Sequence, residues 1–393
     1  MKIILKLLAG MAAGLLIGFF APDWAIRTVL TARSLIGELI LFTIPLIILF
    51  FITSGIASLP RDSGKLLGRT VAFAYGSTLV AGTLAFLVAL AVLPPLAPAA
   101  AQAGSAHTAL TPFFEIKIDP FFGVITALAA SFVFGVGISA LRSTTLKAVF
   151  DDGRDIIDRL LARVIIPLLP LYIAGVFTEM AADGSAFTTL HAFGLVLLVA
   201  VFLHWAWLST LFVVTGLLNG RSPLELIRLM MPAYVTALGT MSSAATIPVT
   251  LRAVKALKVR GPIADFVVPL CANIHLSGST ITLVTCSTAV MMMTPGMGLP
   301  GFAEMLPFIM VLGVVMIAAP GAPGGAVMSA LGLLASMLGF TEANLALMIA
   351  LYLAQDSFGT ATNVTGDAVI ALWMDRFFGA KLEAPEPLLV SGA

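Results

Sequence analysis

Charged residues are scarce in this sequence. Of its 393 residues, only 10% are Asp, Glu, Lys or Arg, whereas 60% are hydrophobic. Soluble globular domains carry about 25% charged residues, so this composition argues against a water-soluble enzyme. The formal net charge of +1 also lacks the basic excess that a nucleic-acid-binding protein needs. The sequence therefore predicts a multi-pass protein whose partner is the lipid bilayer, with no nucleic acid bound.

Cysteine is nearly absent as well. The two cysteines, Cys271 and Cys286, lie inside apolar stretches, which excludes a disulfide framework. No small-residue cleavage site follows the first apolar run, so we interpret that run as a membrane helix rather than a signal peptide. Nothing resembles a nucleotide-binding loop or a catalytic constellation, so the sequence predicts neither an ATP-driven protein nor an enzyme.

Long apolar runs dominate what is present. A membrane-spanning helix needs about 20 mostly apolar residues. Clear candidates are residues 3–20, 35–59, 70–93, 121–141, 164–180 and 190–218. In the C-terminal half, small, polar or proline residues interrupt the apolar stretches at 239–248, 272–279, 319–325 and 360–367. Simple spanning helices have little reason to carry such inserts at mid-depth.

The positions of Lys and Arg predict the orientation, because basic residues collect on the cytoplasmic side of a membrane. Both termini are predicted to be cytoplasmic, with only Arg27, Arg33 and Lys117 outside. Residues 224–254 begin and end next to basic groups, so this segment must enter and return. Residues 294–341 contain no Lys or Arg, so both ends of that segment lie outside.

These positions predict two hairpins of opposite orientation, and we expect each hairpin to be followed by a broken helix. Non-helical backbone at membrane depth survives only where protein or water satisfies its polar groups. The tips at 239–248 and 319–325 should therefore meet around a polar cavity near the midplane. Inverted repeats with such a cavity are typical of secondary transporters.

Three motifs in the C-terminal half resemble those of a known family: the serine-containing first tip, the Pro-Gly second tip and the run from Asn363 to Asp367. Together they resemble the dicarboxylate/amino acid:cation symporters, the glutamate-transporter family. The resemblance implies an all-α polytopic membrane protein with eight transmembrane helices and two oppositely oriented re-entrant hairpins, 224–255 and 301–340. It also implies a homotrimer in the inner (plasma) membrane.

The resemblance further implies a division into scaffold and transport domains. Residues 1–65 and 113–186 would form the scaffold. Residues 66–112, with the third helix, and residues 187–393, with both hairpins, would form a transport domain that moves like an elevator.

In the family, the acid matching Asp356 binds the α-ammonium group of an amino acid. Gly359 stands where acidic-substrate carriers place an arginine, and Met241 stands where some relatives have another. The sequence thus keeps an acid for the ammonium group but lacks an arginine for a side-chain carboxylate, which favours a small neutral amino acid as the substrate. The full predicted substrate set is Ser242, Ser243, Ala322, Pro323, Gly324, Asp356, Gly359, Thr360 and Asn363.

Asp367 is the expected cation ligand, since an ionised carboxylate in an apolar helix is costly and usually functional. The predicted cation set is Asp367, Asn363, His275, Ile274 and Ser277, partly through backbone carbonyls. The cation is Na⁺, with H⁺ as the alternative. Ser277 replaces an acid of the family motif. In the family, a third sodium site also uses hydroxyls of the third helix, and of the matching residues Thr78, Ala81 and Gly82 only Thr78 has one. We therefore expect the third sodium site to be absent.

His275 replaces an asparagine of the same motif. It could carry a coupled proton, or it could remain a neutral imidazole that stabilises the broken helix; the second interpretation is favoured. The predicted function is a cation-coupled symporter of a small neutral amino acid. The alternatives are a dicarboxylate or acidic amino acid symporter, a proton-coupled carrier, and an uncoupled channel or sensor.

Overall fold

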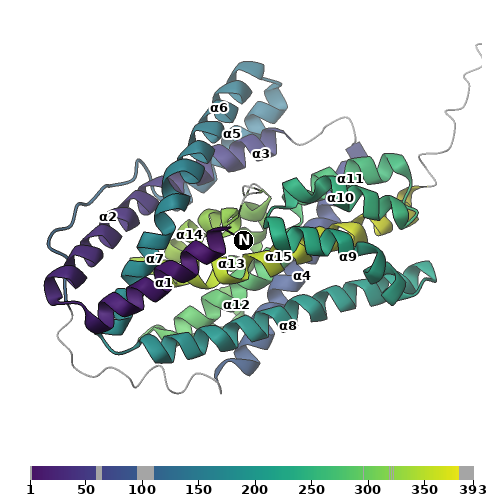
Figure 1. Ribbon diagram of the computed structural model, residues 1–393. Helices are drawn as coiled ribbons and strands as arrows, with labels where there is room; N and C mark the ends of the chain where they lie inside the picture. The colour runs from purple at the N-terminus through teal and green to yellow at the C-terminus, as the bar shows by residue number, and fades with distance from the viewer. Residues whose placement is uncertain are drawn as a thin grey trace, which may run out of the picture.

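The computed structural model describes residues 2–58, 64–94, 110–294, 296–317, 319, 321 and 323–379. Within these ranges every regular element is helical, which confirms the predicted all-α class (Figure 1). Six helical stretches are long and apolar enough to cross a membrane: Asp23–Ala57, Lys65–Val92, Val124–Leu141, Thr144–Ala182, Thr189–Asn219 and Gly261–Met293. Shorter apolar helices include Leu5–Phe20, which lies within the first predicted span.

The first group of helices comes from residues 2–57 and 124–182. It comprises α1 (Lys2–Phe20), α2 (Asp23–Ile47), α3 (Thr53–Ala57), α5 (Val124–Leu141), α6 (Thr144–Leu160) and α7 (Ile166–Ala182). Five-residue π-helical segments, Ile48–Ile52 and Leu161–Ile165, join α2 to α3 and α6 to α7. Both α1 and α2 pack against α7. Figure 1 shows α5 and α6 projecting from this group, away from the long central helices.

Glycines bring α1 and α7 into close contact. A Cβ atom added at Gly10, Gly14 or Gly18 would collide with the backbone of α7. The Thr178 hydroxyl donates to the Gly14 carbonyl oxygen at 3.2 Å and to its own helix at Ala174. This spacing of small residues allows two helices to approach closely where no water can contribute a hydrophobic driving force.

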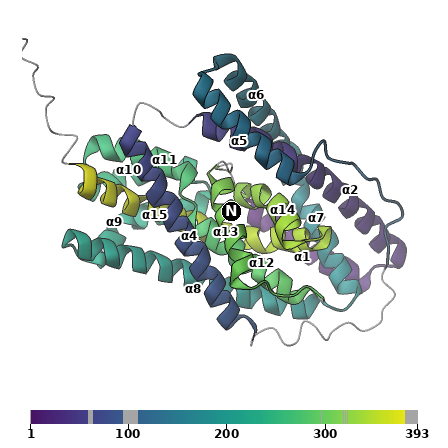
Figure 2. The same ribbon diagram turned by 180° about the vertical axis from the view of Figure 1, so that it is seen from behind.

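The second group surrounds α15. It comprises α4 (Gly64–Val92), α8 (Ala186–Asn219), α9 (Pro223–Thr240), α10 (Ser243–Ala256), α11 (Gly261–Ile274), α12 (Ser277–Met293), α13 (Phe302–Met316), α14 (Gly325–Leu338) and α15 (Glu342–Phe378). Helix α15 packs against α4, α8, α9, α10, α11 and α12, and both views show it running through the middle of the group (Figures 1 and 2). Most of its residues between Asn344 and Met374 are buried.

Two helical hairpins lie where the sequence predicts them. Helices α9 and α10 form the first, with Met241 and Ser242 at its tip, and α13 and α14 form the second. Their entry into a membrane from opposite sides stays a prediction.

One predicted break forms and the other does not. The chain leaves the helical conformation at His275 and Leu276, between α11 and α12. The predicted break at 360–367 is wrong, because α15 is continuous from Glu342 to Phe378. Polar side chains in this stretch bond to other elements, as Asn363 does to α12, or to the preceding turn, as Thr362 does at the Phe358 carbonyl oxygen, and the helix continues. The small residues serve close packing: an added Cβ at Gly366 would lie 2.7 Å from His275 Cε1.

Candidate functional site

The tips of the two hairpins touch. The Ser242 hydroxyl donates to the Gly321 carbonyl oxygen at 2.6 Å and accepts from the Ala245 backbone N–H at 3.2 Å. Ser242 is therefore both the N-cap of α10 and the bridge to the second hairpin. The residue before it, Met241, is buried with φ 53°. A non-glycine residue rarely adopts this left-handed conformation, so the first tip is a tightly constrained turn.

Asp356 connects α15 to the second tip. One of its carboxylate oxygens accepts the Gly324 backbone N–H at 2.7 Å, and the other accepts the Thr360 hydroxyl at 3.4 Å. The side chain is 4% exposed. Gly324 has φ +76°, a conformation that glycine adopts without steric strain. A buried carboxylate thus fixes the turn that begins α14.

Asn363 caps the start of α12 from a different helix. Its side-chain oxygen accepts the backbone N–H groups of Gly278 and Ser279 at 2.8 and 3.2 Å. Its amide nitrogen donates to the Ser279 hydroxyl at 2.9 Å. The first N–H groups of a helix have no partner within the helix. Asn363 supplies that partner, which stabilises the helix that restarts after the break.

Asp367 lies at the other side of the break. The Asp367 carboxylate is 3.0 Å from His275 Nδ1, and His275 Nε2 is 2.9 Å from the Ser77 hydroxyl on α4. The Asp367 and His275 side chains are 1% and 0% exposed. With Nδ1–H donating to the carboxylate, a neutral ring accepts from Ser77 at Nε2. This buried chain joins α4, the break and α15.

Several of the predicted substrate and cation residues therefore fall into two neighbouring clusters, together with Gly321, Ser77 and Ser279, which were not predicted. The tip cluster consists of Ser242, Gly321, Gly324, Asp356 and Thr360. The break cluster consists of Ser77, His275, Ser279, Asn363 and Asp367. Thr360 and Asn363, one turn apart on α15, connect the clusters.

The remaining predicted residues take varied positions. Ser243 is buried as the first residue of α10, and Pro323 is half-buried beside Gly324. Ile274 ends α11 and Ser277 begins α12, and the buried Ser277 hydroxyl has no hydrogen-bond partner within the described residues. Ala322 lies outside the described residues.

Gly359 faces α12. A Cβ added there would lie 3.2 Å from the Thr282 hydroxyl, and a Cβ at Gly278 would collide with the Gly359 carbonyl. These two glycines let α12 and α15 approach closely.

Sequence reasoning missed Ser77 and assigned no role to His204. Ser77 precedes Thr78, the hydroxyl considered for a third ion site, whose side chain instead donates to its own helix at Ala74. Buried His204 contacts the Gly278 carbonyl oxygen at 3.0 Å and the Thr282 hydroxyl at 3.1 Å through Nε2. A hydroxyl or imidazole inside an otherwise apolar run is the only signal that sequence offers for such contacts.

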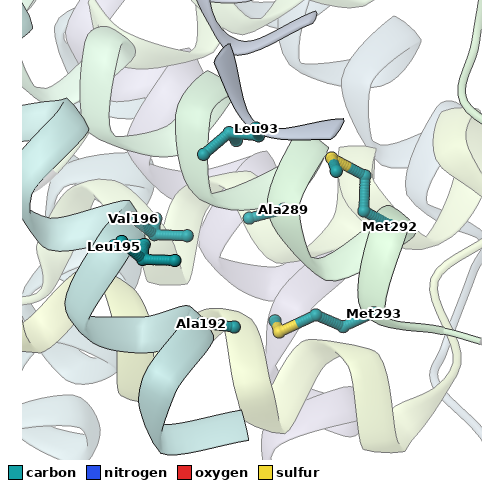
Figure 3. Close-up of a pocket in the computed structure, with 7 residues that line it drawn as sticks. All are labelled: Leu93, Ala192, Leu195, Val196, Ala289, Met292 and Met293. Atoms are coloured by element: carbon teal, nitrogen blue, oxygen red, sulfur yellow. The ribbon is translucent and has the colours of Figure 1, made fainter. Parts of the chain in front are cut away.

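The part of the sequence that carries most residues of both clusters has no basic side chain. No Lys or Arg occurs between Arg260 and Arg376, and Arg260 contacts Asp375 near the end of α15. In the described residues no group of three or more His, Cys, Asp or Glu side chains could hold a metal ion. A small pocket between α4, α8 and α12 is lined by apolar residues alone: Leu93, Ala192, Leu195, Val196, Ala289, Met292 and Met293 (Figure 3). Such a lining offers nothing to a charged ligand.

A multi-pass helical protein with two buried carboxylates at the junction of two hairpin tips and a broken helix has the features of a membrane symporter. The model of the sodium:dicarboxylate symporter family matches residues 3–377, and the chain belongs to that family. It is 26% identical over 428 aligned residues to a C4-dicarboxylate transport protein of Sphingopyxis alaskensis, covering 99% of this chain and 93% of the relative.

A second relative is excitatory amino acid transporter 4 of Mus musculus. The two sequences are 28% identical over 262 residues, which is 65% of this chain and 46% of the relative. Family membership makes the chain a membrane transport protein of a cation-coupled symporter family.

Proposed function

We propose that this protein is a cation-coupled symporter of a small neutral amino acid. The observation that carries the proposal is Asp356, a buried carboxylate at the junction of α15 and the second tip. Among the described residues its partners are the Gly324 backbone N–H and the hydroxyls of Thr360 and Tyr352, and none of these carries a positive charge. A substrate ammonium group would supply that charge and form a strong charge-assisted hydrogen bond.

The opposite end of the substrate would meet the first tip. Ser242 and Ser243 begin α10, and a helix N-terminus favours a carboxylate through its free N–H groups and partial positive charge. Ser242 would exchange its bond to Gly321 for one to the substrate, which would part the two tips. We assign Thr360, Asn363, Ala322, Pro323, Gly324 and Gly359 to the surroundings of this substrate, Gly359 through its close packing on α12.

The charge of the substrate follows from what the site lacks. A second substrate carboxylate would need a basic partner, and the sequence has none between Arg260 and Arg376, nor at Met241. This absence favours a substrate with an uncharged side chain.

A dicarboxylate is the competing substrate class. The name of the Sphingopyxis relative, which aligns with 99% of this chain, favours it. The acidic Asp356 would repel such a substrate, so we rank it second.

We propose the break cluster as the cation site. Asp367 would supply the charge, and backbone carbonyls at the end of α11, including Ile274 and His275, would supply neutral oxygens, with Asn363 and Ser277 beside them. Helix C-termini leave carbonyl groups without intrahelical partners, and the break after Ile274 creates such an end. We take Na⁺ as the cation, with H⁺ as the alternative.

The proposed movement follows the two packing groups. Residues 1–65 and 113–186 would stay fixed as a scaffold within a homotrimer in the inner membrane, with both termini cytoplasmic. Residues 66–112 and 187–393 would carry the substrate across in an elevator-type motion.

Uptake by proteoliposomes tests the function. Labelled alanine, serine and threonine would be offered with succinate and aspartate as controls, under an inward Na⁺ gradient and, separately, an inward proton gradient. Uptake of a neutral amino acid that Asp356→Asn abolishes supports the proposal. Uptake of succinate or aspartate alone refutes the neutral substrate, uptake driven only by protons refutes Na⁺, and a substrate-independent current indicates a channel.

A further inference from the structure

The imidazole of His275 stands where the cation would bind Asp367. Nδ1 lies 3.0 Å from one carboxylate oxygen, and both side chains are buried. A Na⁺ ion takes oxygen ligands, whereas a ring that accepts from Ser77 at Nε2 presents an Nδ1–H to Asp367, and this hydrogen carries partial positive charge. At short range in a poorly solvated site, that hydrogen and a cation repel each other. The ring and the cation therefore compete for the same carboxylate.

Contacts on two sides hold the ring in this position. The Ser77 hydroxyl on α4 lies 2.9 Å from Nε2. On the α15 side, Gly366 makes room for the ring, since an added Cβ would lie 2.7 Å from Cε1. Ser77 and His275 are 198 residues apart in sequence, so the contact is a product of the fold. Beside the ring in sequence, the buried Ser277 hydroxyl has no partner within the described chain.

We infer that His275 is a built-in competitor for the coupling cation at Asp367, that Ser77 holds it there, and that this pair sets the cation affinity of the protein. The inference rests on the proposed cation site. Binding a cation requires the ring to leave the carboxylate, which breaks one hydrogen bond to a charged group. Such bonds are stronger than neutral ones, so the competition weakens cation binding by a measurable factor.

Na⁺ binding to the purified protein without any substrate tests this inference. The affinity would be measured with radioactive Na⁺ on protein in lipid nanodiscs, with choline chloride keeping the ionic strength constant. We expect His275→Asn to bind Na⁺ about tenfold more tightly than wild type, because the competing bond to a charged group is lost. Ser77→Ala keeps the imidazole but removes the hydroxyl that contacts Nε2, so this variant should bind Na⁺ about threefold more tightly than wild type.

His204→Asn is the matched control, since it removes another fully buried imidazole that contacts Gly278 and Thr282 instead of Asp367. Its Na⁺ affinity should equal that of wild type. Weaker Na⁺ binding by His275→Asn would overturn the inference and make His275 a ligand. No Na⁺ binding by any of the proteins would also overturn it. If His275→Asn does not fold, an unchanged affinity of Ser77→Ala overturns it. If the Na⁺ affinities shift as expected but no amino acid is taken up, the proposed substrate is refuted, while the competition between His275 and the cation remains supported.

Discussion

Two close helix contacts in this protein solve the same packing problem with different chemistry. At the α1–α7 contact, Gly10, Gly14 and Gly18 bring two helices together, and in the described part of this contact the side-chain hydrogen bond across it joins the Thr178 hydroxyl to the Gly14 carbonyl oxygen. At the α12–α15 contact, Gly278 and Gly359 do the same, but Asn363 caps the facing helix beside them. One contact is nearly apolar, and the other carries a buried polar network.

The difference separates stability from function. Glycine alone is sufficient for close packing, as α1 and α7 demonstrate. Asp356 and Asp367 add a desolvation penalty that packing does not require. A membrane protein retains buried ionisable groups chiefly where they bind a substrate or an ion. We therefore expect substitutions at the two contacts to have separable effects.

The largest effect should come from removing the charge at the break. Asp367→Asn keeps an oxygen that can accept the His275 N–H, so the fold should persist. Its neutral amide cannot balance a bound cation, and loss of one member of a buried charge pair costs about 3 kcal/mol or more. At about 1.4 kcal/mol per tenfold change, uptake should fall about 100-fold or more.

Initial uptake rates in proteoliposomes, normalised to folded protein, measure this effect. The control is Asp265→Asn, which removes an acid paired with Lys255 on the surface. Exposed ion pairs contribute little, so this variant should transport as wild type does. Transport by Asp367→Asn within a factor of two of wild type would contradict the cation role.

Gly14→Leu should disrupt the other contact. The added side chain collides with the α7 backbone, and overpacking a close contact costs about 1–3 kcal/mol. Thermal unfolding in detergent should occur at a lower temperature, while the folded fraction keeps the substrate affinity of wild type. Gly194→Leu is the control, because no atom lies within 4 Å of a Cβ at that position. A large loss of substrate affinity in Gly14→Leu would remove the distinction between the contacts.

Asn363→Ala should affect both stability and transport. It leaves the Gly278 and Ser279 N–H groups without their partner, at a cost of about 1–3 kcal/mol. We expect a lower unfolding temperature together with weaker substrate binding, measured on the same preparation. Asn219→Ala, which removes an amide bonded only to its own helix at Thr215, should change neither quantity appreciably. An effect on unfolding alone would limit Asn363 to a structural role.

The smallest expected effect belongs to Ser242→Ala. It removes the cap of α10 and the contact with Gly321, and loss of a cap costs about 1 kcal/mol. The substrate carboxylate would also lose the Ser242 hydroxyl as a donor, a hydrogen bond that contributes about 1 kcal/mol, so we expect an affinity loss of about fivefold in equilibrium substrate binding. Ser336→Ala, whose hydroxyl donates only to Gly332 in its own helix, should bind normally. Tighter substrate binding by Ser242→Ala would show that the tip contact opposes the substrate.

Hairpin positions could be predicted from the sequence because they depend on local signals. Basic residues and their absence define the ends, and the polar interruptions define the tips. The break at His275 was predicted in the same way. The break predicted in α15 was wrong, because its polar residues find partners that leave the helix intact. Asp356 and Asn363 bond to Gly324 and to α12, and Thr362 bonds to the preceding turn at Phe358. Hydropathy does not reveal such partners.

The hydrogen-bond partners within the site could not be predicted from the sequence either. Ser77 meets His275 only because α4 packs beside the break, and no spacing rule connects residues so far apart. The orientation of Gly359 depends on the rotation of α15 against α12. The sequence could indicate candidate residues for an amino acid and a cation, but only packing determines which of these residues already bond to one another.

The central claim is that the carboxylates on α15 serve transport of a neutral amino acid and not packing. Its most direct test is the uptake of labelled alanine under an imposed Na⁺ gradient by wild type and Asp356→Asn at equal amounts of folded protein. The account predicts robust uptake by wild type and none above background by the variant. Equal uptake by both proteins would contradict it.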